Sequence, residues 1–134
     1  MANVKHKFKY KRIGDFYRPF IDITLRNGTH MCKYAALIDS GADFNIFHAD
    51  IARLLHIDFT KLKEITFGGI KEDKTPCKGY VAGVEIGINE RFFNALVVFS
   101  ADISQNGSGV LDQRGFFEHF RVIFDYTDKV GYLR

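Results

Sequence analysis

Asp39, Ser40 and Gly41 are the residues of this sequence whose types and spacing could do chemistry. The apolar residues 36–38 precede them, which is typical of a buried strand that breaks into a tight turn and leaves one carboxylate at its end. Gly41 lacks the Cβ that would block a close backbone approach, and Ser40 places a hydroxyl beside the carboxylate. Asp-Ser-Gly is also an ordinary turn sequence, so the alternative is a plain turn without chemistry.

The segments that must position Asp39 have the pattern of a β-hairpin. Residues 16–25 predict a strand, and Asn27-Gly28 is a strong two-residue hairpin signal. The return strand over residues 30–38 would then deliver Asp39 at its end. A hairpin therefore accounts for the position of the carboxylate.

The rest of the chain predicts further short strands and little helix. A short amphipathic helix is expected over residues 47–55, with Ile51, Leu54 and Leu55 on one apolar face. Strands are expected over residues 65–67, 80–88, 92–99, 110–111, 122–124 and 130–133, and a brief helical turn over 116–120 with Phe116, Phe117 and Phe120 in the core. Many short strands separated by Gly and Asn turns predict an all-β barrel or sandwich.

Three motifs, taken in order, resemble the retropepsin-like aspartic proteases, the single-domain relatives of pepsin found in retroviruses and as stand-alone cellular proteins. They are Asp39-Ser40-Gly41-Ala42-Asp43, Phe67-Gly68-Gly69-Ile70, and Val110-Leu111 followed by residues 115–126. Residues 47–55 also resemble the short helix that stand-alone members carry after the catalytic loop. The resemblance covers residues 16–134 as one domain and implies a closed all-β barrel of short strands with a flap hairpin and one or two short helices.

The resemblance implies a homodimeric aspartic endopeptidase that hydrolyses a protein or peptide held in an extended conformation. Asp39 from each protomer would form the dyad that activates a water molecule, and Ser40 and Gly41 would complete the catalytic loop. Substrate-binding roles are implied for Ala42, Asp43, Gly68, Gly69, Ile70, Val110 and Leu111. The chemistry that the resemblance implies uses neither a metal nor another cofactor.

Asp112 departs from the family pattern, because the family normally has glycine at this position, close behind the catalytic loop. A carboxylate there needs a new partner or a shifted backbone. In retroviral members, an Arg in this stretch pairs with the Asp at the position of Asp43, whereas this chain continues with Gln113-Arg114. Arg114 could pair with Asp43 through a local shift or with Asp112, and the sequence leaves both arrangements open.

Composition and cysteine content bound the class of protein. A chain of 134 residues with 46% hydrophobic residues and 14 Phe predicts a packed domain. We find no apolar run of membrane-span length and no secretory signal. Cys32 and Cys77 do not make a disulfide framework, and His30 with Cys32 does not complete a recognised metal spacing. We therefore expect a cytoplasmic protein with reduced cysteines, no membrane contact and no metal.

Two alternatives to a protease remain, and the second depends on the distribution of charge. The net charge is +3, and the basic residues of an N-terminal extension over residues 1–15 (Lys5, Lys7, Lys9, Lys11 and Arg12) supply +5. Because the remainder is close to neutral, we do not expect nucleic acid as a partner. One alternative is a non-catalytic retropepsin-fold domain for dimerisation or peptide binding, with Asp112 marking a remodelled site. The other is a nucleic-acid binder that uses the alternating basic and aromatic residues 7–11, which otherwise suit an edge strand.

Overall fold

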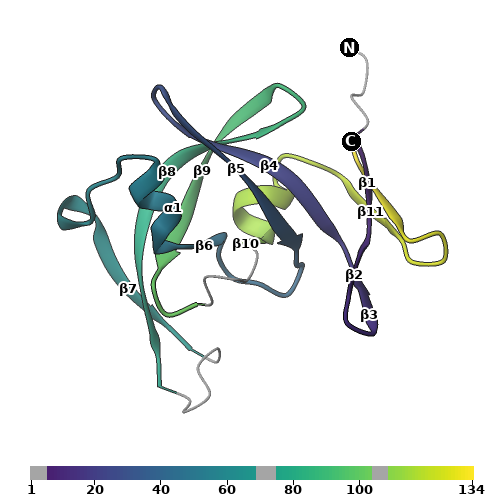
Figure 1. Cartoon of the computed structure of the whole chain (residues 1–134), viewed down its shortest axis with the longest axis horizontal. Helices are drawn as coiled ribbons and strands as arrows, with labels where there is room; N and C mark the ends of the chain where they lie inside the picture. The colour runs from purple at the N-terminus through teal and green to yellow at the C-terminus, as the bar shows by residue number, and fades with distance from the viewer. Residues whose placement is uncertain (1–5, 69–74, 104–108) are drawn as a thin grey trace.

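A closed ring of six strands forms the body of the protein (Figure 1). The computed structural model describes residues 6–68, 75–103 and 109–134, except the side chain of Arg114. Around the ring the strands follow the order β4 (Phe20–Asn27), β5 (His30–Ile38), β10 (Gly109–Leu111), β6 (Ile46–His48), β9 (Arg91–Ser100) and β8 (Cys77–Ile88), and β8 pairs again with β4. The predicted all-β closed barrel is confirmed.

Two smaller strand assemblies and three short helical segments complete the fold. β7 (Lys63–Phe67) extends the barrel sheet from β8, and β2 (Lys11–Ile13) pairs with β3 (Phe16–Arg18) as a separate hairpin. A three-stranded terminal sheet has the order β1 (His6–Lys9), β12 (Val130–Leu133) and β11 (Val122–Asp125). The helical segments are α1 (Ala49–Leu54), η1 (Phe59–Lys61) and η2 (Gln113–Phe117). None of the helices in the described residues is long and apolar enough to cross a membrane.

The β4–β5 hairpin is formed as the sequence predicts. Asn27 pairs with His30 across the turn, and Gly28 has a φ of +60°, which favours glycine. The strand predicted over residues 16–25 is interrupted at Pro19, whose missing N–H cannot join a ladder; its carbonyl accepts a bond from Ile38 instead. Alternate residues of β4 point inward, so Ile21, Ile23 and Leu25 are buried in the core.

The core is filled by large aromatic and aliphatic side chains inside the barrel. Phe47, Phe99 and Phe116 are fully buried. Phe117 and Phe120 are half-buried and pack against the same core, as the sequence predicts. The ring of Phe47 lies so close to Gly109 that a Cβ there would come within 2.3 Å of it.

The helix predicted over residues 47–55 begins later than expected. Phe47 and His48 belong to β6, which pairs in parallel with β9, and α1 starts only at Ala49. Ile51 and Leu55 are buried, but Leu54 is 60% exposed, so the expectation that Leu54 shares their buried face is wrong. Because α1 has only 6 residues, fewer of its apolar side chains pack against the barrel than the periodicity predicts.

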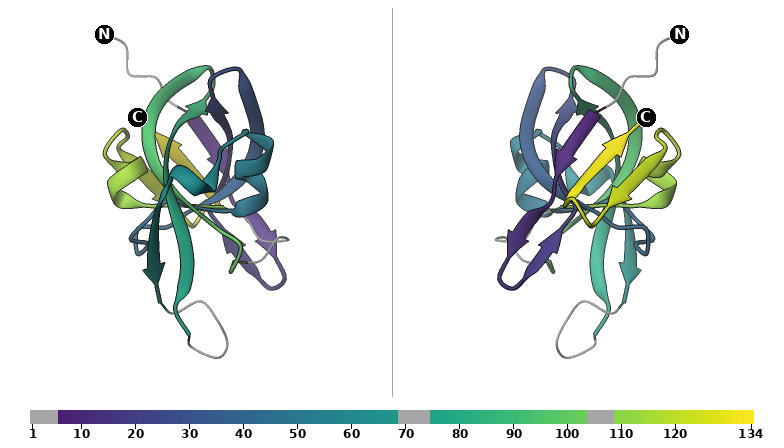
Figure 2. Two further views of the ribbon diagram at one scale, coloured as in Figure 1. Left: turned by 90° about the vertical axis from the view of Figure 1, so that its left-hand side faces the viewer. Right: turned by 90° about the vertical axis from the view of Figure 1, so that its right-hand side faces the viewer.

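Two of the basic residues near the N-terminus, Lys7 and Lys9, lie in the edge strand β1. Lys7 and Lys9 of β1 are exposed, whereas Phe8 between them is buried and covers Gly131 of β12. Both views of Figure 2 show the β2–β3 hairpin and the paired strands β7 and β8 extending from the barrel in the same direction.

Candidate active site

Asp39 lies directly after β5, in a turn that its own carboxylate stabilises. The backbone N–H of Gly41 donates to Asp39 Oδ1 at 2.9 Å, and the N–H of Ala42 donates to the Asp39 carbonyl at 3.2 Å. Asp39 is half-buried, while Ser40 and Gly41 are exposed. The turn therefore presents the Asp-Ser-Gly tripeptide at the surface of the single chain.

Strand β10 holds this turn from behind. It runs parallel to β5, so that Leu111 pairs with Ile38, and the N–H of Asp39 donates to the Leu111 carbonyl at 3.0 Å. The side-chain amide of Gln113 donates to the carbonyl of Ser40. Sequence reasoning noted Gln113 only as part of a departure from the family pattern, and its bond to the turn was missed. Two backbone positions of the turn are thus fixed by the segment that follows residue 109.

Asp112 has a hydrogen-bond partner for its carboxylate, which a carboxylate at this position needs. It is 2% exposed, and its carboxylate accepts the N–H of Gly115 at 2.7 Å, which caps the start of η2. The carboxylate of Asp112 therefore caps the N-terminus of η2, as the side chain of an N-cap residue does. The two pairings open for Arg114 depend on its side chain, which lies outside the described part of the structure.

Asn45 is a buried polar residue that the sequence analysis did not single out. Its Oδ1 accepts the N–H of Asp112 at 2.8 Å, and its Nδ2 donates to the carbonyl of Leu96 on β9 at 3.2 Å. Gly115 lies against the same amide, and a Cβ on Gly115 would come within 2.0 Å of Asn45 Nδ2. Asn45 therefore ties the loop after β5 to both β9 and the start of η2.

The residues predicted to bind substrate are spread around this turn. Asp43 and Gly68 are exposed, and Ala42 and Val110 are half-buried, whereas Leu111 is fully buried in the core behind the turn. The predicted residues Gly69 and Ile70 lie outside the described residues. Phe44 and Phe67 bring the loop and the end of β7 together, with their ring centroids 6.4 Å apart.

Two polar side chains, those of Ser100 and Asp102, fix the start of β8, next to the end of β7. The hydroxyl of buried Ser100 donates to the carbonyl of Lys78 at 2.5 Å and accepts the N–H of Asp102 at 3.1 Å. The carboxylate of Asp102 accepts the N–H of Lys78 at 2.7 Å. Side chains thus bond the backbone of Lys78, just beyond the last ladder pair between β8 and β9, Tyr80 with Phe99.

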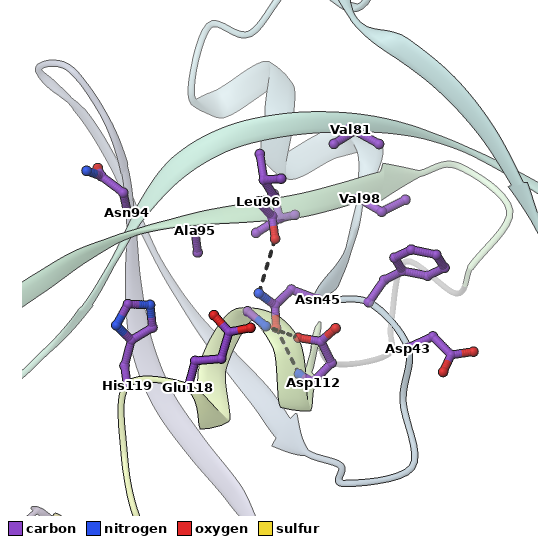
Figure 3. A pocket seen from close by; sticks show the side chains of 13 residues that line it. Asp43, Asn45, Val81, Asn94, Ala95, Leu96, Val98, Asp112, Glu118 and His119 are labelled. Carbon is purple, nitrogen blue, oxygen red and sulfur yellow. Dashed lines mark hydrogen bonds between the residues drawn. The ribbon is translucent and has the colours of Figure 1, made fainter.

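A cavity of about 440 Å³ lies beside the loop, between β9 and η2 (Figure 3). Its lining includes Asp43 and Phe44 from the loop, Leu96 from β9, and Glu118 and His119 from the chain after η2. The cavity adjoins the loop through Asp43 and does not include Asp39.

A comparison with solved structures finds a protease with a similar fold. A retropepsin-like aspartic protease from Rickettsia conorii superposes with a TM-score of 0.67 at 18% sequence identity, over 99% of this chain and 96% of that one. The EIAV protease, solved in complex with the inhibitor HBY-793, gives a TM-score of 0.48 at 14% identity, over 77% of this chain and 88% of that one. No protein-family model and no curated protein sequence matches this chain. Because the Rickettsia protein matches along nearly the whole chain, this protein has the retropepsin-like fold that the motifs predict.

Proposed function

We propose that this protein is a homodimeric aspartic endopeptidase in which Asp39 of each protomer forms a catalytic dyad. The observation that carries the proposal is the Asp39 turn itself, on a retropepsin-like fold. β10 and Gln113 hold the turn from behind, and Ser40 and Gly41 are exposed at its tip. The one half-buried carboxylate of the turn needs a second carboxylate with which to share a proton, so the chemistry requires a second copy of the chain.

In the proposed dimer, a two-fold axis passes between the two turns, because an isologous interface places a residue on the axis against its own copy. Two carboxylates at that distance cannot both ionise easily, so they share one proton and titrate as a unit. The ionised member takes a proton from a bound water molecule as the water attacks the peptide carbonyl. The protonated member donates to the carbonyl oxygen.

The neighbouring residues have supporting roles in this proposal. Ser40 steadies the pair of turns across the axis, and the carbonyl of Gly41 accepts a bond from the substrate backbone. Ala42, Asp43 and Val110 line the path of an extended peptide, while buried Leu111 supports the turn. We assign Gly68, Gly69 and Ile70 to a flap, whose backbone N–H groups would donate to the substrate.

The position of Asp112 supports a working site over a remodelled one. Its carboxylate accepts the N–H of Gly115 at the start of η2, while its neighbours bond to the Asp39 turn, Leu111 through its carbonyl and Gln113 through its side-chain amide. A carboxylate used in this way leaves the Asp39 turn in place. A cytoplasmic location, with Cys32 and Cys77 as free thiols, is part of the same proposal.

The test is cleavage of a diverse peptide library from acid to neutral pH by wild type and Asp39→Asn. We expect cleavage by the wild type and a loss of at least about a hundredfold in Asp39→Asn, because the dyad loses its proton acceptor. Asp128→Asn is the matched control, since it removes an exposed carboxylate from the β11–β12 turn, and it should cleave as the wild type does. Peptide binding without cleavage by the wild type would instead favour the non-catalytic domain.

A further inference from the structure

The cavity beside the Asp39 loop has an apolar floor that is open to solvent. Leu96 of β9 lines the cavity and is 68% exposed, although leucine is usually buried. The residue paired with Leu96 on β8 is Gly83, which has no side chain to cover it and open space where a Cβ would be. Half-buried Val81 and Phe44 and buried Val98 also line the cavity. A ligand in the cavity can therefore bury apolar atoms on this strip.

The rim of the same cavity is acidic. Asp43 and Glu118 are both exposed and come from different segments, the loop after β5 and the chain after η2 (Figure 3). Neither carboxylate has a hydrogen-bond or ion-pair partner among the residues that the structure describes. Of the described side chains that line the cavity, none belongs to Lys or Arg. The rim thus offers two carboxylates above an apolar floor.

We propose that this acidic cavity binds the side chain of a lysine or arginine of the substrate, outside the cleaved bond. These side chains combine an apolar stem with a cationic head, which matches the floor at Leu96 and the rim at Asp43 and Glu118. A metal ion would use the carboxylates but not the apolar floor. The inference rests on the proposed protease function, because it needs an extended peptide that passes Asp43.

The geometry of an extended peptide is consistent with this position. An extended chain advances about 3.3 Å per residue, and the cavity includes Asp43 but not Asp39, so a substrate lying along Asp43 would meet the cavity outside the cut bond. The cavity would therefore select one position of the substrate at a fixed separation from the cleavage site. The preference should be visible as an enrichment of Lys and Arg at a single position of the cleaved peptides.

Cleavage of matched peptides tests the proposal. For peptides that the wild type cuts, each position is changed in turn to Lys or Gln, and kcat/KM is compared. We expect one position outside the cut bond where Lys is favoured over Gln by about three- to fivefold, as for a partly exposed ion pair. Glu118→Gln should bring this ratio toward one, and Glu118→Lys should favour Glu at that position. Glu90→Gln, the same chemical change in the β8–β9 turn, should keep the wild-type ratio.

Binding to a catalytically inactive protein separates failure of the inference from failure of the proposed function. Immobilised Asp39→Asn protein is used to select from a random peptide pool, with Asp39→Asn/Glu118→Gln alongside. Enrichment of Lys and Arg that disappears with Glu118→Gln supports the acidic cavity even if the wild type cleaves nothing. Equal selection by both proteins, or an unchanged Lys-to-Gln ratio in Glu118→Gln and Glu118→Lys, would overturn it.

Discussion

Asn45 shows how a single buried amide supports the candidate active site. It is 1% exposed, and its two polar atoms bond to backbone groups on two different segments. In the wild type, Asn45 Oδ1 accepts the Asp112 N–H and Nδ2 donates to the Leu96 carbonyl. These bonds position the chain from which Gln113 reaches the Asp39 turn.

We predict that Asn45→Ala lowers the free energy of unfolding by about 2–4 kcal/mol, because two buried backbone groups lose their partners at about 1–3 kcal/mol each. Urea unfolding monitored by circular dichroism measures this change. Asn45→Asp is the matched variant, since it keeps an acceptor for Asp112 but turns an oxygen toward the Leu96 carbonyl. It should also destabilise, and a wild-type unfolding curve for Asn45→Ala would contradict this account.

The sequence identifies the Asp39 turn but not Asn45, and the reason is physical. The signal for Asp39, Ser40 and Gly41 is local, an apolar strand followed by a small-residue turn. The bonding partners of Asn45 come 51 and 67 residues later in the chain. No local sequence pattern indicates partners so distant in the chain. A buried polar residue such as Asn45 can therefore be identified only from the folded barrel.

At the scale of elements, the hairpin was predictable and the start of the helix was not. Asn27-Gly28 specifies the β4–β5 turn through local backbone preference. The boundary between β6 and α1 depends instead on the parallel pairing of Phe47 and His48 with β9, which keeps both residues extended. Apolar periodicity in the segment did not reveal that pairing.

His48 ends β6 and also caps α1. Its Nδ1 accepts the N–H of Asp50 at 3.0 Å, and the side chain is buried. We predict that His48→Ala lowers stability by about 1 kcal/mol through loss of the cap, and that His48→Asn loses less, because Asn is a favoured N-cap residue. Thermal unfolding of the two variants side by side measures the difference. If His48→Ala and His48→Asn had the same melting temperature, a capping contribution would be ruled out.

Half-buried His6 begins β1, where it pairs with Leu133 of β12. Burial lowers the pKa of His6 below its usual 6.5, and the nearby charge of Asp22 only partly offsets this. Because the folded pKa lies below the unfolded one, the unfolded state binds the proton first as pH falls through about 6.5. We predict that the free energy of unfolding drops between pH 8 and about 5.5, and that His6→Gln has a smaller drop. His30→Gln, at an exposed position of β5, serves as the control variant, and an equal drop in His6→Gln and wild type would refute the role of His6.

At the scale of the whole molecule, closure of the barrel depends on pairings between distant segments. β5 pairs in parallel with β10, β6 pairs in parallel with β9, and β8 returns to β4 with Gly87 opposite Thr24. The number and shortness of the strands indicate a barrel or a sandwich, but only the motif order selects between them. The parallel pairing of Leu111 with Ile38 is the one that places β10 behind Asp39.

The dimer proposal makes a quantitative prediction for mixed subunits. When wild type and Asp39→Asn are combined in equal amounts and allowed to exchange, about one quarter of randomly formed two-fold dimers contain two intact carboxylates. Activity at constant total protein should then fall to about one quarter of the wild-type value, because a dyad with one carboxamide cannot share a proton. A site complete within one chain would retain about one half. Peptide cleavage measured across a series of mixing ratios distinguishes a quadratic from a linear dependence on the wild-type fraction, and a linear one would mean that each chain works alone.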